Sequence, residues 1–307
     1  MISRRGFVGI CAAGWLRGAE REPLTWEAPQ AGSAGLERRY RADAQVVLLG
    51  LTLLHRQDVG DGSASWREWT AKDGAAMRVV EFSGRSAPER AAGLNRMGLM
   101  QELSRTAGGA GTESLYFGVM TSSPEDNAAD AKKALHSTAQ DAMYSAIEGH
   151  LTASAVETTG AKFVAAARTA EAERSELIGK ARQALAGAEK KTAAWHSGEA
   201  PLPFLHALAW LLTHGGVTET RCAYNGRMYR LKAQRAADAK ATALYRGEKL
   251  IAAGAAVTRV SATLQREEGG ALNEFRLWVE EGSPRPLPLR IEYQAKAYLR
   301  LTFETRG

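Results

Sequence analysis

Residues 287–303 read LPLRIEYQAKAYLRLTF, and this stretch indicates the fold class. Apolar side chains occupy the odd positions from Leu287 to Phe303, and the even positions between them are mostly polar. Successive side chains of a β-strand point to opposite faces, so this pattern predicts an antiparallel sheet with one dry face and one wet face. The stretch is longer than the usual strand of about 5–6 residues. It therefore predicts either two strands or one long bent strand, and no turn residue marks a break.

Similar patterns extend outward from this stretch over much of the chain. A first strand is expected to start at Tyr40 and to end at a turn formed by Gly60-Asp61-Gly62. Asn225-Gly226 lies between two strand-like runs, and this dipeptide favours the positive φ angles of a tight hairpin turn. Further strands are expected at 63–70, 76–82, 147–154, 221–224, 227–233, 242–246, 259–266 and 274–280.

Four segments carry helix signals instead. A serine followed by a proline, as at Ser123-Pro124, is typical of a helix start, because serine caps the first turn and proline suits the first helical position. Helical insertions are expected near 86–97, 124–136, 171–187 and 203–214. The predicted fold class is mainly β (α+β): a strongly curved antiparallel sheet or half-barrel with several helices packed on or inside it. Residues 37–307 are expected to form one domain, preceded by an irregular leader at 20–36.

The composition excludes several classes of protein. The chain has 307 residues, of which 45% are hydrophobic and 24% charged, as in ordinary soluble domains. No run of about 18 apolar residues occurs, so no transmembrane helix is expected. The formal net charge is +6, but the basic residues are interspersed with acids, whereas nucleic-acid binders concentrate lysine and arginine on one face. Nucleic acid is therefore not an expected partner.

The N-terminus resembles a twin-arginine export signal. Ser3 precedes Arg4 and Arg5, and Phe7 and Val8 follow after one residue. A short apolar stretch comes next, too short to span a bilayer, and small residues precede a possible cleavage point after Ala19. Residues 1–19 are therefore interpreted as a twin-arginine-type signal peptide, which implies the twin-arginine translocase as a partner and a periplasmic or otherwise exported location in a bacterium. The alternative is a basic N-terminal tail.

Two runs near the C-terminus carry a family resemblance. Residues 273–279 read NEFRLWV, and residues 285–293 read RPLPLRIEY. A strand ending in tryptophan, then a proline-containing turn and a final alternating hairpin, resembles a group of uncharacterised bacterial exported proteins with a β-rich domain of unknown function. Their fold is similar to the half-barrels of periplasmic lipoprotein carriers. The usual aspartate of the turn is absent, and Glu280-Glu281-Gly282-Ser283 stand in its place. The resemblance implies a fold and a compartment, not an activity.

No motif specific enough to name a reaction, a metal site or a cofactor occurs. His206 and His214 are eight residues apart, about 12 Å along a helix axis, so one metal ion cannot bridge them. The local signatures of serine hydrolases and dinucleotide-binding proteins are missing. Cys222 falls in a predicted strand, where a buried structural thiol is more common than a nucleophile. An enzyme is therefore less expected than a binding protein, and no catalytic residue is assigned.

Four side chains on the expected inward face of the last strands suggest a ligand site. Phe275, Leu277, Ile291 and Tyr293 share one face, which fits either a packed core or an apolar cavity. The leading hypothesis is an exported half-barrel protein that binds a lipid, another apolar ligand or a cell-envelope component at these residues. The alternatives are a structural or interaction protein with a filled core and, less expected, a hydrolase whose residues meet only in the fold.

Overall fold

A computed structural model describes ten segments of the chain: residues 24–26, 33–48, 51–91, 95–107, 111–122, 141–166, 171–194, 200–270, 272–296 and 298–306. The signal-like segment 1–19 and the helix expected near 124–136 lie outside the described residues. In the expected leader, residues 34–36 already belong to the first strand.

The described residues contain fifteen strands, of which one, at an edge of the sheet, has only two residues. The first seven strands are β1 (Ala34–Leu48), β2 (Leu51–Thr70), β3 (Ala76–Ser86), β4 (Met97–Ala107), β5 (Gly111–Thr121), β6 (Asp141–Leu151) and β7 (Ala155–Ala166). The others are β8 (Lys190–Ala194), β9 (Leu202–Pro203), β10 (Glu219–Tyr224), β11 (Arg227–Ala237), β12 (Val257–Arg266), β13 (Asn273–Glu280), β14 (Arg290–Lys296) and β15 (Leu299–Thr305). The helices are α2 (Glu171–Ala186), α3 (Phe204–Thr213) and α4 (Ala239–Gly247).

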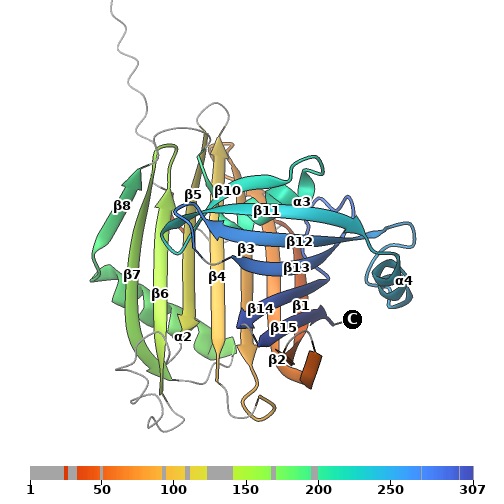
Figure 1. The fold of residues 1–307 in the computed structure, drawn as a ribbon. Helices are drawn as coiled ribbons and strands as arrows, with labels where there is room; N and C mark the ends of the chain where they lie inside the picture. The colour runs from red at the N-terminus through yellow and green to blue at the C-terminus, as the bar shows by residue number, and fades with distance from the viewer. Residues whose placement is uncertain are drawn as a thin grey trace, which may run out of the picture.

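All fifteen strands belong to one sheet (Figure 1). Its order is β8-β7-β6-β5-β4-β3-β2-β1-β15-β14-β13-β12-β11-β10-β9, so the chain runs as two meanders joined where β1 pairs with β15. Neighbouring strands are antiparallel except β9 and β10, which are parallel. The alternating stretch contributes to two strands: β14 ends at Lys296, and β15 begins at Leu299.

The predicted fold class, a curved sheet or half-barrel with several helices packed on or inside it, is wrong. Strands dominate, and the described residues contain three helices around a sheet of fifteen strands. The sheet does not close into a barrel, because its edge strands β8 and β9 do not pair. Of the four expected helical insertions, those near 171–187 and 203–214 occur as α2 and α3. The described part of 86–97 is not helical, because a serine and a proline that can start a helix also occur in turns.

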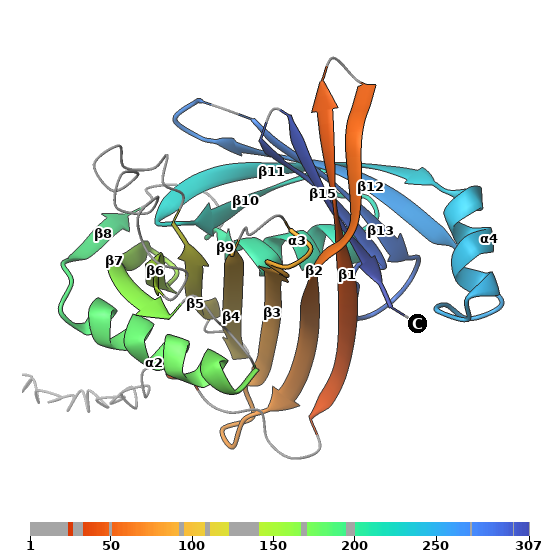
Figure 2. The same cartoon turned by 90° about the horizontal axis from the view of Figure 1, so that it is seen from below.

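Helix α3 lies between the two halves of the sheet (Figure 2). Leu205 and Ala209 pack on the N-terminal half, with Tyr40, Trp66 and Val80. Its other side packs on the C-terminal half, in a cluster that contains Ala207, Leu211, Cys222, Leu231, Val260 and Leu277. The inward apolar faces of both meanders are therefore covered by the same helix, which we call the shared core helix.

The other two helices cover the opposite face of the sheet. On α2, Leu177, Ala181 and Leu185 pack against a cluster that includes Leu99 and Phe117, whose side chains point away from α3. On α4, Tyr245 packs against Trp278. The parity of β13 predicts this outward position for Trp278, since Leu277 and Val279 point toward α3.

The two ends of the sheet approach each other without pairing. Tyr116, Leu151 and Val156 of the N-terminal half form a buried cluster with Ala223 of β10. The Tyr116 hydroxyl also lies 2.8 Å from the hydroxyl of Thr158 in β7. Side-chain packing, rather than a continuous ladder of hydrogen bonds, thus brings β5, β6 and β7 against β10.

Three local expectations are corrected. The residues Gly60-Asp61-Gly62 do not form a turn but lie inside β2, where a Cβ on Gly60 would come within 2.1 Å of the Arg85 carbonyl oxygen of β3. The strand expected at 242–246 is part of α4, which Asp238 caps. No helix occurs in the described part of 86–97: Ser86 ends β3, and its hydroxyl accepts a hydrogen bond from the Arg96 amide at 2.7 Å, which fastens the connection to β4.

The hairpin turn at Asn225-Gly226 is confirmed. Both residues have positive φ, 48° and 67°. Glycine adopts this region without strain, whereas most other residues do not, and a Cβ on Gly226 would also lie 2.9 Å from the Cγ2 atom of Thr158. The position therefore requires glycine for two independent reasons.

We predict that Gly226→Val lowers the free energy of unfolding by about 1–3 kcal/mol, because valine at positive φ is strained. Urea unfolding measures the change. Gly254→Val is the matched control, because a Cβ there meets nothing within 4 Å and φ is not positive. Equal effects of the two substitutions would show that the turn is not under this constraint.

Candidate functional site

The four residues predicted to bind an apolar ligand share one face of β13 and β14. Phe275 pairs with Tyr293, and Leu277 pairs with Ile291. Leu277 is buried in the cluster around α3, and Phe275 meets Phe204 of α3 edge to face, with ring centroids 6.0 Å apart. Tyr293 is 39% exposed. The shared core helix thus contacts part of this face, and ligand binding at these residues stays a prediction.

A cluster of three buried polar side chains lies where α3 meets β4. The Nδ1 atom of His206 lies 3.0 Å from Oε2 of Glu102, and the Nε2 atom lies 3.0 Å from the Ser104 hydroxyl oxygen. The side chains of His206 and Glu102 are only 3% and 2% exposed. Glu102 and Ser104 have the same parity on β4 and therefore point to the same face of the sheet.

Glu102 also holds the first turn of α3. Its two carboxylate oxygens accept hydrogen bonds from the backbone amides of Leu205, at 2.8 Å, and His206, at 2.9 Å. The residue before the helix is Pro203, which makes no side-chain cap. A carboxylate from a distant strand therefore supplies the capping acceptor, and its negative charge also suits the positive end of the helix dipole.

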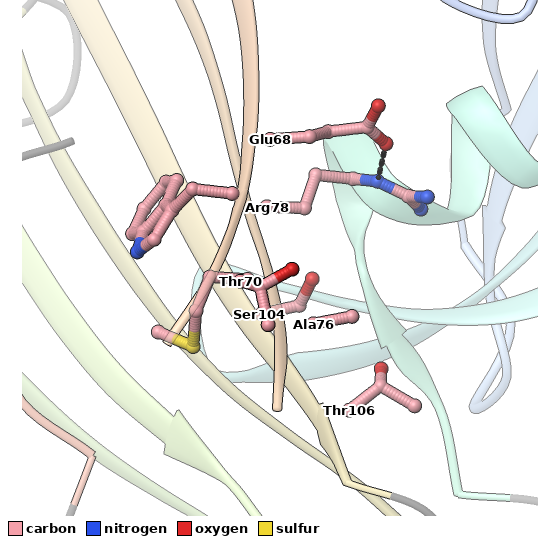
Figure 3. A pocket seen from close by; sticks show the side chains of 8 residues that line it. Glu68, Thr70, Ala76, Arg78, Ser104 and Thr106 are labelled. Atoms are coloured by element: carbon pink, nitrogen blue, oxygen red, sulfur yellow. Dashed lines mark hydrogen bonds and ion pairs between the residues drawn. The ribbon is translucent and has the colours of Figure 1, made fainter. Parts of the chain in front are cut away.

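A pocket of about 330 Å³ opens beside this cluster (Figure 3). Ser104 is part of its wall, so the same serine contacts both His206 and the pocket. The labelled side chains of the wall come from β2, β3 and β4 and are Glu68, Thr70, Ala76, Arg78, Ser104 and Thr106. Arg78 lies directly opposite Ser104 in the ladder and forms an ion pair with Glu68 at 2.9 Å.

Sequence reasoning missed this cluster. It treated His206 only as a possible partner of His214 and assigned no role to Glu102 or Ser104. Glu102 and His206 are 104 positions apart in the chain, and only the packing of α3 on β4 brings them together. The one available signal was a glutamate and a serine at alternate positions of a strand that is otherwise rich in apolar residues.

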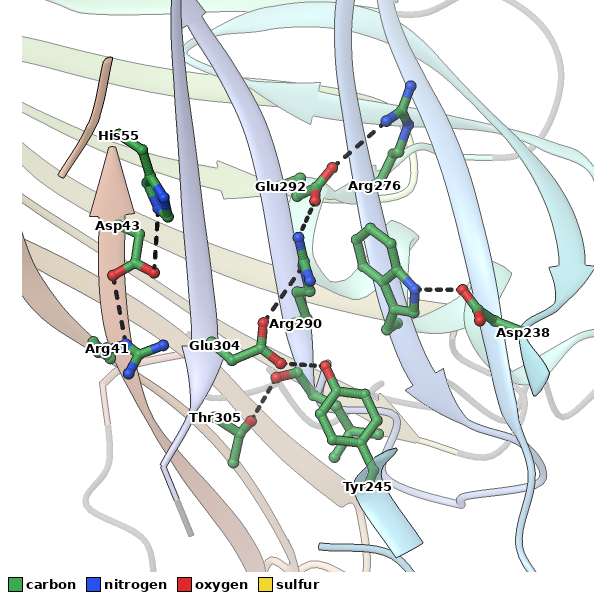
Figure 4. A network of polar contacts seen from close by, with 12 residues as sticks. Arg41, Asp43, His55, Asp238, Tyr245, Arg276, Arg290, Glu292, Glu304 and Thr305 are labelled. Carbon is green, nitrogen blue, oxygen red and sulfur yellow. Dashed lines mark hydrogen bonds and ion pairs between the residues drawn. The ribbon is translucent and has the colours of Figure 1, made fainter. Parts of the chain in front are cut away.

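The outer face of the C-terminal half carries a polar network (Figure 4). Arg290 connects Glu292 with Glu304, and its guanidinium lies 4.8 Å from the centre of the Trp278 ring. Burial raises the pKa of Glu304, which accepts a hydrogen bond from the Tyr245 hydroxyl. These contacts join α4 to β13, β14 and β15, so their role is to fix the helix on the sheet.

Asp238 completes the attachment of α4. It accepts hydrogen bonds from the Ala241 amide and from the Trp278 indole, each at 2.9 Å (Figure 4). The same two donors lower the pKa of Asp238, because they stabilise its charged form.

A different feature is found where β1 and β2 extend past their neighbours. β1 pairs with β15 only as far as Val46, and β2 pairs with β3 only from Gly60 onward. Beyond these points the two strands continue as a two-stranded ribbon, which Figure 2 shows projecting from the sheet. We call this ribbon, described at residues 46–48 and 51–54, the apolar hairpin.

The apolar hairpin exposes large side chains on both faces. Leu53 and Leu54 are neighbours and so point to opposite faces, yet they are 61% and 48% exposed. Tyr298, whose carbonyl accepts a hydrogen bond from the Val47 amide, is 52% exposed. A two-stranded ribbon is marginally stable in water by itself, and exposed apolar surface of this kind marks an interaction site.

The charges around the apolar hairpin are of one sign. Residues 44–57 contain His55 and Arg56 and no acid, and residues 294–300 contain Lys296 and Arg300 and no acid. Gln45 lies opposite His55 in β2 and opposite Arg300 in β15, so the basic positions surround the base of the hairpin. The nearest acids of β1 and β2 are held in contacts of their own: Asp43 lies within 4 Å of Arg41 and His55, and Asp58 pairs with Arg90 and Arg306.

The described residues do not favour a thiol nucleophile or a metal centre. Cys222 is fully buried, and burial raises the pKa of its thiol, which disfavours the nucleophilic thiolate. Among the described residues, no group of three histidine, cysteine or acidic side chains is placed to hold a metal ion. Within the same residues, no helix is long and apolar enough to cross a membrane.

Comparisons with known proteins give little more. No family model matches the chain, and no curated protein matches it. Among solved structures, the chain is similar to the crystal structure of a beta-barrel-like protein of a domain of unknown function, DUF1849, from Brucella abortus. The two are 7% identical, the match covers 88% of this chain and 96% of that chain, and the TM-score is 0.44. At this level the likeness establishes no activity, ligand or cellular location.

The role of Glu102 in holding α3 gives a prediction. Glu102→Ala leaves two backbone amides and the Nδ1 atom of His206 without their acceptor, and each buried unsatisfied donor costs about 1–3 kcal/mol. We expect the free energy of unfolding in urea to fall by about 3 kcal/mol or more. Glu68→Ala is the control. Glu68 is on the same face, but its side chain is a third exposed, and its ion pairs contribute less than about 1 kcal/mol. Similar losses in both variants would contradict the role given to Glu102.

Proposed function

We propose that this protein is exported to the bacterial cell envelope and docks on an anionic membrane surface through the apolar hairpin. The observation that carries the proposal is a projecting ribbon with exposed leucines on both faces and basic residues at its base. Packing of the core of the sheet does not account for Leu53 and Leu54 in these exposed positions.

The energetics fit reversible binding. Burying a fully exposed leucine is worth about 1.5–3 kcal/mol, so these half-exposed leucines supply about 1 kcal/mol each. A basic residue near an anionic bilayer adds about 1 kcal/mol. The apolar part of the hairpin includes only a few residues of each strand, so it can reach the boundary between head groups and acyl chains.

The charge around the hairpin favours a lipid surface over an apolar ligand or a protein groove. An anionic bilayer offers apolar depth and a continuous plane of negative charge, which complements Arg56 and Arg300 together. A soluble apolar ligand would use the leucines but not the surrounding charge. A second copy of this chain would bring its own basic residues into repulsion.

The export part of the proposal rests on the N-terminal motif. Ser3, Arg4, Arg5 and Phe7 match the twin-arginine pattern, and the membranes of the envelope are the surfaces that an exported protein meets. Anionic phospholipid at the outer surface of the inner membrane is the expected target.

We predict that the protein binds vesicles made of equal parts of phosphatidylglycerol and phosphatidylethanolamine. Leu53→Ser with Leu54→Ser should weaken this binding about tenfold or more, since 1.4 kcal/mol corresponds to a factor of ten. Sedimentation with vesicles measures the affinity. Leu244→Ser is the matched control, because Leu244 of α4 is 49% exposed but far from the hairpin in the sheet order, and it should bind as the wild type does.

Substitution of the basic residues is the second part of this experiment. Arg56→Gln with Arg300→Gln should weaken binding and reduce its dependence on salt, and vesicles of phosphatidylcholine should bind poorly. The proposal is overturned if the wild type ignores anionic vesicles, or if the double leucine variant binds them unchanged. A dimer that forms in the wild type and is lost in the leucine variant would assign the hairpin to self-association instead.

Export has a separate test. Replacing Arg4 and Arg5 by lysine should keep the protein in the cytoplasm, because the twin-arginine translocase reads the guanidinium pair. Fractionation of cells that express the variant measures this. Unchanged periplasmic yield, in the variant or in a strain without that translocase, would exclude the route.

A further inference from the structure

We propose that Ser104 is the nucleophile of an acyl-transfer site, with His206 as its general base and Glu102 as the carboxylate that orients the histidine. The arrangement is a serine hydroxyl 3.0 Å from Nε2 of a histidine whose Nδ1 lies 3.0 Å from a buried carboxylate. Such a site is recognised by geometry and not by the order of its residues in the chain.

The hydrogen bonds determine which nitrogen of His206 carries the proton. The Glu102 carboxylate already accepts from two backbone amides and can only accept from the ring as well, so Nδ1 donates to it. Nε2 then has a free lone pair, which accepts the hydrogen bond of the Ser104 hydroxyl. This tautomer is the one that can remove the proton of the serine during attack.

Ser104 lines the pocket, so a substrate bound there would lie beside this residue. Its volume of about 330 Å³ is at the small end for ligand sites, and its wall carries the hydroxyls of Thr70 and Thr106 and the guanidinium of Arg78 (Figure 3). These groups can donate hydrogen bonds to a carbonyl oxygen as it becomes negative. The size and polarity of the wall point to an ester of a short acyl chain as the substrate class.

The reaction balances with water as the only co-reactant. The Ser104 oxygen bonds to the ester carbonyl carbon while its proton moves to Nε2 of His206. The bond from that carbon to the leaving oxygen then breaks, and the leaving alcohol takes the proton from His206. Water attacks the acyl-serine in the same way, giving the carboxylic acid and restoring the Ser104 hydroxyl.

A purely structural role predicts something different for Ser104. Seating α3 requires Glu102 and the amides of Leu205 and His206, but it does not require a reactive serine hydroxyl at the pocket wall. Ser114 is the natural comparison, because it is buried, lies directly opposite Ser104 on β5 and has the same parity. A reagent selective for activated serines distinguishes the two.

The test is labelling of the intact protein with a fluorophosphonate, followed by peptide mapping, and hydrolysis of p-nitrophenyl acetate. We expect one adduct, on Ser104, and measurable hydrolysis of the ester. Ser104→Ala should abolish both, and Ser114→Ala should keep both. His206→Gln should lower the rate of labelling by about 10²–10⁴-fold, the usual contribution of a general base.

The labelling of the wild type decides the matter even if a variant fails to fold. No adduct on Ser104 in folded wild-type protein, or equal labelling of the Ser104→Ala variant, would overturn the proposal and leave the cluster as a support for α3. The result is independent of the proposed membrane function, since Ser104→Ala should bind anionic vesicles as the wild type does. The double leucine variant should likewise keep its reactivity.

Discussion

The packing of α3 against both halves of the sheet is the interaction on which the rest of the structure depends. Each meander turns an apolar face inward, and a single ten-residue helix covers both of these inward faces. The helix is fixed at its two ends by side chains from opposite halves. Glu102 of β4 accepts from its first amides, and Arg235 of β11 donates to the carbonyls of Leu211, His214, Gly215 and Val217 around its last turn.

This arrangement requires the two ends of the chain to meet. β1 pairs with β15 along seven residues, so the halves become one sheet only when the last strand is in place. On the outer face, the network around Arg290 and the contact of Trp278 with α4 support the strands next to this seam. The apolar hairpin starts at the same seam, and β15 pairs with its base only as far as Val46.

The two proposed sites occupy opposite ends of one strand. Leu53 and Leu54 are near the start of β2, and Thr70, in the wall of the pocket, is its last residue. At about 3.3 Å per residue, roughly 50 Å of strand separates them. A protein docked by its hairpin would thus keep the pocket beside Ser104 away from the membrane surface, open to soluble esters.

The sequence by itself determined the strands and little of their arrangement. The alternation from Leu287 to Phe303, the Asn225-Gly226 turn and the outward position of Trp278 follow from local rules, because a strand has a period of two and a tight turn needs positive φ. Glycines at 60 and 62 misled the same reasoning, since glycine serves equally for a turn and for close approach of two strands. The meeting of Glu102, Ser104 and His206, the seam between β1 and β15, and the exposure of Leu53 and Leu54 were decided by the tertiary structure alone. Each depends on which distant segment packs on a strand, and the side-chain pattern of one segment does not contain that information.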